Sequence, residues 1–187
     1  MNIVLFGPPG AGKGTQAKHL VKKIDGFQIS TGEMLRNEIY KNSKIGKEIS
    51  NDMKDGNFVS DKIVNKLINE IISDSKKKNR LIFDGYPRTL SQAKDLDIFL
   101  NDSGQKIDFI FFLNVNKDLI IERIKKRKNL ENRSDDDLQT ILKRYDTYME
   151  TTKPVLEFYS KNPNFHEIDG ALEIDEITNK IDAFLGV

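Results

Sequence analysis

Residues 7–15, GPPGAGKGT, contain four glycines and one lysine and directly follow the apolar run Ile3–Phe6. Glycine has no side chain to block an approaching anion, so a glycine-rich loop can point several backbone N–H groups at one phosphate. A helix that begins at the end of the loop presents its N-terminus to the same anion. Because Lys13 adds a full positive charge, the stretch predicts a phosphate-binding loop between a strand and a helix.

One position departs from the general form of this loop. The general pattern has serine or threonine directly after the lysine, where the hydroxyl contacts Mg²⁺. Here Gly14 follows Lys13, and Thr15 comes one position later. The magnesium role therefore does not transfer directly to Thr15, although its hydroxyl can still reach a phosphate. The loop alone predicts a nucleoside triphosphate site and leaves the reaction open.

Composition limits the class of protein. A chain of 187 residues is one sizeable domain, and 37% hydrophobic with 32% charged residues is typical of a soluble globular protein. Thirty basic against 29 acidic residues give a net charge of +1, whereas a chain that binds nucleic acid along its length is more basic. We therefore expect no nucleic-acid partner, and positive charge that is concentrated locally.

The absence of cysteine excludes disulfides and cysteine-ligated zinc. The two histidines, His19 and His166, are expected on the surface or in packing rather than at a metal. No apolar run approaches the roughly 18 residues of a membrane span. Met1 and Asn2 lead straight into the first apolar run, which leaves no room for a cleavable signal. We expect a cytoplasmic protein with no membrane partner.

Short apolar runs alternate with longer amphipathic stretches along the chain. Several of these runs are nearly continuous, as in strands that are buried on both faces of a parallel sheet. Strand and helix in alternation predict an α/β fold, with a five-stranded parallel sheet between two layers of helices. The expected strands are residues 3–6, 27–29, 81–83, 109–113 and 165–168.

Two stretches interrupt this alternation. Residues 31–75 are expected to be helical throughout and to form an inserted lobe between the second and third strands. Residues 126–134, KRKNLENRS, are polar and are expected to form a short loop between two helices. Ser134 is the expected N-cap of the second helix, because three aspartates follow it in the first turn.

Residues 84–88, DGYPR, form a second candidate site. Asp84 ends an apolar run, the position of a carboxylate that orients magnesium through water. Gly85 and Pro87 favour a tight turn, and Arg88 follows where ligands bind in open α/β sheets. A GTP-binding switch is disfavoured, because residues 116–119, NKDL, place the aspartate one position too early for a guanine-reading motif.

Four phrases in order, GPPGAGKGT, STGEMLR (30–36), DGYPRT (84–89) and RSDD (133–136), resemble adenylate kinase over essentially the whole chain. The resemblance implies a P-loop kinase fold and reversible transfer of the γ-phosphoryl group from MgATP to AMP, giving two ADP. It divides the domain of residues 1–187 into a core (1–29, 76–125 and 135–187), an AMP-binding insertion (30–59) and a short lid (126–134). It also implies a monomer.

The resemblance assigns roles to individual residues, carried over position by position. On the ATP side it implies Gly10, Ala11, Gly12, Lys13, Gly14, Thr15, Arg123, Arg127 and Leu172. On the AMP side it implies Thr31, Arg36, Asn57, Phe58, Val59, Gly85, Tyr86, Pro87, Arg88, Gln92, Arg133 and Arg144. Those expected to act on the transferred group are Lys13, Arg88, Arg123, Arg133 and Arg144, with Asp84 on Mg²⁺.

Within these sets, Arg123 and Arg127 lie four residues apart and share a helix face, which by itself equally suits a solvated basic surface. Gln92 resembles the amide that reads the adenine edge. Glu33 stands where the family more often has aspartate. The lid is of the short type, for which no structural zinc is expected.

Alternative functions stay open at this point. Thr31 and Thr89 favour adenine by resemblance, since the related uridylate and cytidylate kinases tend to carry alanine and asparagine there. A UMP/CMP kinase of the same fold is the nearest alternative, and a non-catalytic nucleotide-binding regulator is another. The basic run of residues 125–128 is better explained by a phosphate site than by nucleic acid, given the near-neutral total charge.

Overall fold

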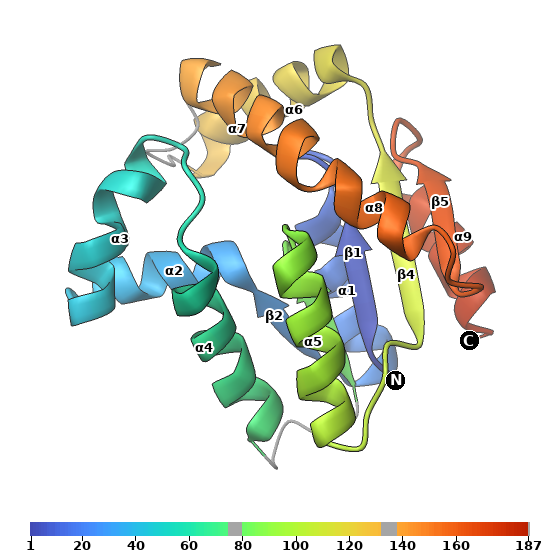
Figure 1. The fold of residues 1–187 in the computed structure, drawn as a ribbon. Coiled ribbons are helices and arrows are strands. Elements are labelled where there is room, and N and C mark those ends of the chain that lie inside the picture. Colours follow the sequence, from blue (N-terminus) through green and yellow to red (C-terminus); the bar gives the residue numbers. More distant parts are fainter. Residues whose placement is uncertain (75–79, 132–137, 187) are drawn as a thin grey trace.

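The computed structural model describes residues 1–74, 80–131 and 138–186. Within these residues five strands form one parallel sheet in the order β2-β3-β1-β4-β5 (Figure 1). The strands are β1 (Ile3–Phe6), β2 (Phe27–Ser30), β3 (Leu81–Asp84), β4 (Phe109–Asn114) and β5 (Phe165–Asp169). All five predicted strands are confirmed, and four of them extend one residue further than predicted.

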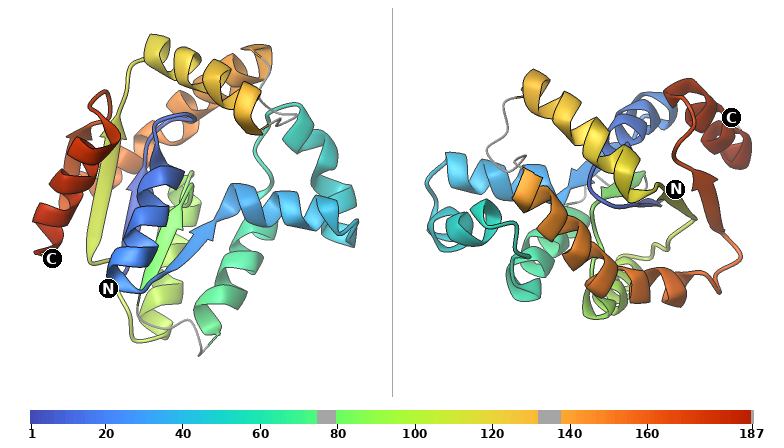
Figure 2. Two further views of the ribbon diagram at one scale, coloured as in Figure 1. Left: turned by 180° about the vertical axis from the view of Figure 1, so that it is seen from behind. Right: turned by 90° about the horizontal axis from the view of Figure 1, so that it is seen from above.

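Helices cover both faces of this sheet (Figures 1 and 2). They are α1 (Lys13–Ile24), α2 (Thr31–Tyr40), α3 (Lys44–Lys54), α4 (Asp61–Ser73), α5 (Leu90–Asp102), α6 (Lys117–Glu131), α7 (Leu138–Thr151), α8 (Lys153–Tyr159) and α9 (Ile174–Leu185). The predicted three-layer α/β architecture is therefore confirmed. No helix in the described ranges has both the length and the apolar character needed to cross a bilayer.

The central strand β1 shows why the strands read as continuous apolar runs. All four of its residues are buried, and side chains alternate between the two faces of the sheet. Val4 and Phe6 join one core cluster with residues of α5 and α8, and Ile3 and Leu5 join the other with residues of α1 and α9. Because helices cover both faces of the sheet, the side chains on each face of β1 have to be apolar.

The segment between β2 and β3 is helical, as predicted, through α2, α3 and α4. The first two helices pack very closely, because Gly46 of α3 lies against the backbone of Glu38 in α2. Ser43 caps α3 by accepting a hydrogen bond from the Gly46 N–H at 2.9 Å, and its hydroxyl donates to the Glu38 carboxylate at 2.6 Å. The helical hairpin is thereby held at its turn.

The prediction of a loop over residues 126–134 is wrong for residues 126–131, where α6 continues to Glu131. Lysine, arginine, leucine and glutamate are good helix formers, so polarity alone did not justify a loop. Lys126 also pairs with Glu122 one turn earlier, with Nζ and Oε1 2.7 Å apart. The remainder of the predicted loop, including the Ser134 cap, lies outside the described residues.

Replacement of Gly46 by alanine is expected to destabilise the protein. An added Cβ would lie 2.1 Å from the Glu38 carbonyl oxygen, so α2 and α3 would have to separate. Alanine is the better helix former by about 1 kcal/mol, yet we expect a net loss of about 2 kcal/mol or more. Chemical unfolding of Gly46→Ala and of the exposed control Lys47→Ala measures this, and equal stability of the two variants would contradict it.

Candidate active site

The glycine-rich loop connects β1 to α1, at the carboxyl end of the central strand. Gly12, the N-cap of α1, has φ +98° and Gly10 has φ +83°, conformations that disfavour any residue with a side chain. A Cβ on Gly10 would also lie 2.9 Å from Cγ1 of Ile124 in α6. The loop therefore packs directly on α6 while its backbone stays open for an anion.

The Lys13 ammonium lies across this loop. Its Nζ donates to the carbonyl oxygens of Gly7 at 2.7 Å and Pro8 at 3.0 Å. The predicted cation is thus at the mouth of the loop, beside the first turn of α1. An anion bound to the loop would meet both the lysine charge and the positive end of the helix dipole.

Asp84 ends β3, the strand next to β1, and its carboxylate lies beside the loop. Its Oδ2 is 3.6 Å from where a Cβ on Gly14 would be. The Gln28 side chain on β2 donates from Nε2 to the same oxygen at 3.1 Å. Sequence reasoning missed Gln28; the only available signal was a polar residue in a mostly apolar strand. The carboxylate is consequently held in one orientation facing the loop.

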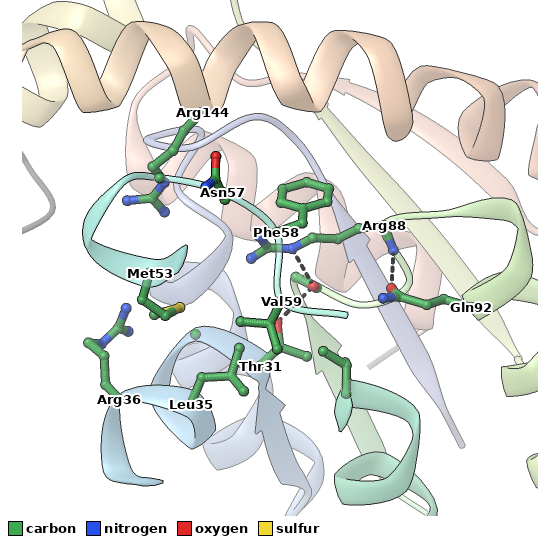
Figure 3. A pocket seen from close by; sticks show the side chains of 14 residues that line it. Thr31, Leu35, Arg36, Met53, Asn57, Phe58, Val59, Arg88, Gln92 and Arg144 are labelled. Atoms are coloured by element: carbon green, nitrogen blue, oxygen red, sulfur yellow. Dashed lines mark hydrogen bonds between the residues drawn. The ribbon is translucent and has the colours of Figure 1, made fainter. Parts of the chain in front are cut away.

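The turn after β3 places Arg88 against the helical insertion. The Gly85 carbonyl accepts from Arg88 Nε and from the Thr31 hydroxyl, both at 2.8 Å (Figure 3). The guanidinium carbon of Arg88 lies 5.0 Å from the centre of the Phe58 ring, in a cation–π contact. Arg88 is therefore fixed by the turn on one side and by the α3–α4 loop on the other.

Positive charge is concentrated around Arg88. Burial, together with the nearby guanidinium groups of Arg144 and Arg36, lowers the pKa of Arg88 to about 10, while Asp84 acts in the opposite direction. Arg88 is still protonated at neutral pH, so three like charges are held close to one another. An anion between them would relieve this repulsion, which makes the cluster a candidate phosphate site.

A cavity opens between α2, the α3–α4 loop and the turn after β3 (Figure 3). Nine of the predicted AMP-side residues line it: Thr31, Arg36, Asn57, Phe58, Val59, Gly85, Arg88, Gln92 and Arg144. Its wall also includes Leu35 and Met53, which supply the apolar surface a base needs. Residues remote along the chain thus form one concave surface.

A second cavity adjoins the first on the side of the glycine-rich loop. It is lined by Gly7, Pro9, Lys13 and Pro87 of the two loops, among others. Arg88 and Arg144 line both cavities. Phe58 and Gly85 also line both cavities, so the two hollows share a stretch of wall that includes the two arginines.

Other predicted residues lie elsewhere. Tyr86 is buried, with its hydroxyl donating to Asn65 Oδ1 at 2.8 Å, so its side chain belongs to the core. Arg123 lies on α6 next to Ile124, which packs on the loop. Leu172 follows β5 and packs on the core cluster shared by α1 and α9. The side chain of Arg127 and all of Arg133 lie outside the described residues, so their predicted roles stay predictions.

Metal binding by a cluster of side chains finds no support in the described part of the chain. Those residues contain no group of three or more histidine, aspartate and glutamate side chains placed to hold a metal ion. Asp84 instead offers a single oriented carboxylate next to the phosphate-binding loop. This arrangement suits Mg²⁺ that keeps most of its waters and arrives with a phosphate group.

Comparison with known proteins agrees with this geometry. A family model described as adenylate kinase matches residues 5–164. The chain is 48% identical to an adenylate kinase of Pelagibacter ubique (strain HTCC1062) over the full length of both proteins. It is 42% identical to one of Maricaulis maris (strain MCS10), covering 99% of this chain and 98% of that protein. It is 33% identical to one of Thermosipho africanus (strain TCF52B), covering 97% of each.

A short polyphosphate is expected to bind across the two cavities and stabilise the protein. Tripolyphosphate should raise the melting temperature in a concentration-dependent way, because ligand binding to the folded state adds to stability. Arg88→Met should lose most of this increase, and Lys94→Met, which removes an exposed lysine on α5, should keep it. Equal stabilisation of both variants in a thermal melt would show that Arg88 does not contact the anion.

Proposed function

The chain belongs to the adenylate kinase family and is an ATP:AMP phosphotransferase, and we propose that the two adjoining cavities hold its two nucleotides. In this proposal the γ-phosphoryl group of ATP passes reversibly to AMP at Arg88 and Arg144, giving two ADP. The observation that carries the assignment is that these two arginines line both cavities. A phosphoryl group in transit has to be stabilised where the two sites meet.

The lining of each cavity supports the assignment of its nucleotide. The loop of residues 7–15 and Lys13 suit the triphosphate of ATP. The other cavity combines apolar walls and the Gln92 amide with Arg36 and Arg88, which suits a base at one end and a single phosphate at the other. We therefore place AMP in the cavity beside the insertion.

The main task of this site is to overcome electrostatic repulsion. Two unit charges 4 Å apart interact by about 4 kcal/mol at an effective dielectric constant near 20, and two polyanions must come closer than that along the reaction axis. The AMP phosphate is already a nucleophile, so the reaction needs positioning and charge neutralisation rather than a general base. Arginine suits this role because its planar fork meets phosphate oxygens in pairs.

Magnesium would enter this site with ATP. The fit rests on Asp84, whose oxygen faces the phosphate-binding loop and is held by Gln28. We infer that Asp84 orients the hydrated ion, which when bound reduces the negative charge on the phosphates. Gln28 is then a positioning residue for that carboxylate. We also expect a monomeric, cytoplasmic enzyme without a nucleic-acid or membrane partner.

On the ATP side, we propose that Arg123 and Arg127 contact the phosphates and that Leu172 lies near the adenine, and on the AMP side that Arg133 reaches the phosphate being transferred. The packing of Ile124 against Gly10 supports the first of these, because it brings the Arg123 segment of α6 next to the phosphate-binding loop. For Arg127 and Arg133 the support is the resemblance of the sequence alone.

Exclusion of water is the remaining requirement, because water competes with AMP as acceptor. The insertion contacts α7 near Gly56, where a Cβ would lie 3.0 Å from Cγ2 of Thr140 and 3.2 Å from Cγ of Arg144. We propose that the insertion and the lid close over bound nucleotides, and that this contact is part of the closed arrangement.

Closure predicts compaction in solution. Small-angle X-ray scattering should give a smaller radius of gyration when a two-nucleotide mimic, with two adenosines joined by a phosphate chain, is added. AMP alone should produce only part of this change. An unchanged radius of gyration at a saturating concentration of the mimic would contradict closure.

The residues at the meeting point of the cavities are expected to control the rate. Arg88→Ala or Lys13→Ala should lower kcat for ADP formation by at least about 100-fold with the fold intact, because each removes a charge aligned on the transferred group. Lys94→Ala serves as a control for general loss of positive charge. Near-normal turnover in a folded Arg88→Ala or Lys13→Ala variant would remove that residue from the mechanism.

The choice of acceptor distinguishes this function from its alternatives. Coupled assays of ADP formation with AMP, UMP and CMP test the acceptor base directly, and we expect AMP to be strongly preferred. A UMP/CMP kinase would prefer the pyrimidine nucleotides. A regulator without catalysis would bind ATP and AMP in calorimetry and form no ADP. The adenylate kinase relatives favour neither alternative.

A further inference from the structure

Three polar side chains at the starts of α4 and α5 form a closed hydrogen-bonded group beside the AMP cavity. Asp61, the first residue of α4, accepts from the Thr89 hydroxyl through Oδ2 and from Gln92 Nε2 through Oδ1, each at 2.7 Å. Thr89, the N-cap of α5, accepts in turn from the backbone N–H of Gln92 at 3.2 Å. The Asp61 carboxylate thereby ties the start of α4 to the start of α5.

This group fixes which way the Gln92 amide points. Its Oε1 accepts from the Arg88 backbone N–H at 2.7 Å (Figure 3), while its Nε2 donates to Asp61. A carboxylate only accepts and a backbone N–H only donates, so the reverse orientation would face donor to donor and acceptor to acceptor. Gln92 is only 3% exposed, so water offers little compensation for such a loss.

The fixed amide retains hydrogen-bonding capacity toward a ligand. An amide carries two N–H donors and two acceptor positions, and the contacts above use one of each. Gln92 lines the AMP cavity, so one donor and one acceptor of fixed polarity remain beside it. Adenine presents an acceptor at N1 and a donor at its 6-amino group, whereas a 6-oxo purine presents the opposite pair. An amide held in one orientation can pair with the adenine pattern, but it then places donor against donor and acceptor against acceptor for a 6-oxo purine in the same position.

Resting on the function proposed above, we propose that Asp61 is a positioning residue that sets the polarity of the Gln92 amide. Through that amide it makes the acceptor site select a 6-amino purine over a 6-oxo purine. In this account Asp61 acts on the nucleotide only through Gln92. Thr89 contributes by holding the second oxygen of the same carboxylate.

The chain offers a matched control in Asp95. This carboxylate on α5 also bridges to α4, because it accepts from the Asn65 side-chain amide, whose oxygen accepts from the Tyr86 hydroxyl at 2.8 Å. Both aspartates are half-buried acceptors between the same two helices. Asp95, however, makes no hydrogen bond to Gln92 among the described residues. Its removal therefore reports the cost of a lost inter-helix contact that reaches only the Gln92 backbone carbonyl, through the Tyr86 hydroxyl, and not the side-chain amide.

The test compares AMP with inosine monophosphate, which carries a 6-oxo group, as acceptors at saturating MgATP. In Asp61→Asn the new amide can accept or donate, so only the Arg88 backbone N–H still opposes the reverse orientation of Gln92. The ratio of kcat/KM for AMP to that for inosine monophosphate should fall about 10-fold or more, chiefly through KM for AMP. KM for ATP should change less than about 2-fold, since the ATP contacts are untouched. Asp95→Asn should keep the wild-type ratio.

The outcomes separate this inference from the function on which it rests. Wild-type protein that forms no ADP from AMP and MgATP refutes the function. An active wild type with an unchanged ratio in Asp61→Asn, or with the same fall in Asp95→Asn, overturns the inference alone. The ratio is taken within one preparation, so it does not depend on the folded fraction. Wild-type protein that uses both acceptors equally overturns the inference whatever the variant does.

Discussion

The site depends on the repulsion between guanidinium groups held close together. Arg88 sits between Arg144 and Arg36, and burial together with these like charges lowers its pKa to about 10. Asp84 offsets this only in part. A phosphate group bound between these guanidinium groups would reduce their mutual repulsion, which favours an anion at this position. Because Arg88 and Arg144 also border the cavity of the phosphate-binding loop, the same charges serve both nucleotides.

The fold brings these charges together through the parallel sheet. β1 and β3 are neighbours with matched register, so the phosphate-binding loop and the DGYPR turn leave the sheet at the same edge. α2, α3 and α4, inserted between β2 and β3, bring Arg36 and Phe58 to the far side of the cavity. Small polar contacts then set orientation: Gln28 holds Asp84, and Asp61 holds Gln92. The orientation of side chains in the site is thus set by hydrogen bonds from residues that need not contact the nucleotides themselves.

The sheet and the phosphate-binding loop could be predicted from sequence because their signals are local. Buried parallel strands need continuous apolar runs, and the loop needs glycine at fixed positions. Residues 126–131 were predicted wrongly, because polarity was weighed above helix propensity and the Glu122–Lys126 pair. Gln28 and Asp61 were missed for a different reason. Their partners lie 56 and 31 residues away in the sequence, so their roles exist only once the insertion has folded onto the core.

The most direct test of the central claim is a crystal structure of the protein with a two-nucleotide mimic and Mg²⁺. One adenosine should lie in the cavity lined by Gln92, and the phosphate chain should run from Arg36 to the loop of residues 7–15. Both Arg88 and Arg144 should lie within hydrogen-bonding distance of the phosphates in the middle of that chain. A structure in which the mimic is bound and both guanidinium groups point away from it would contradict the account.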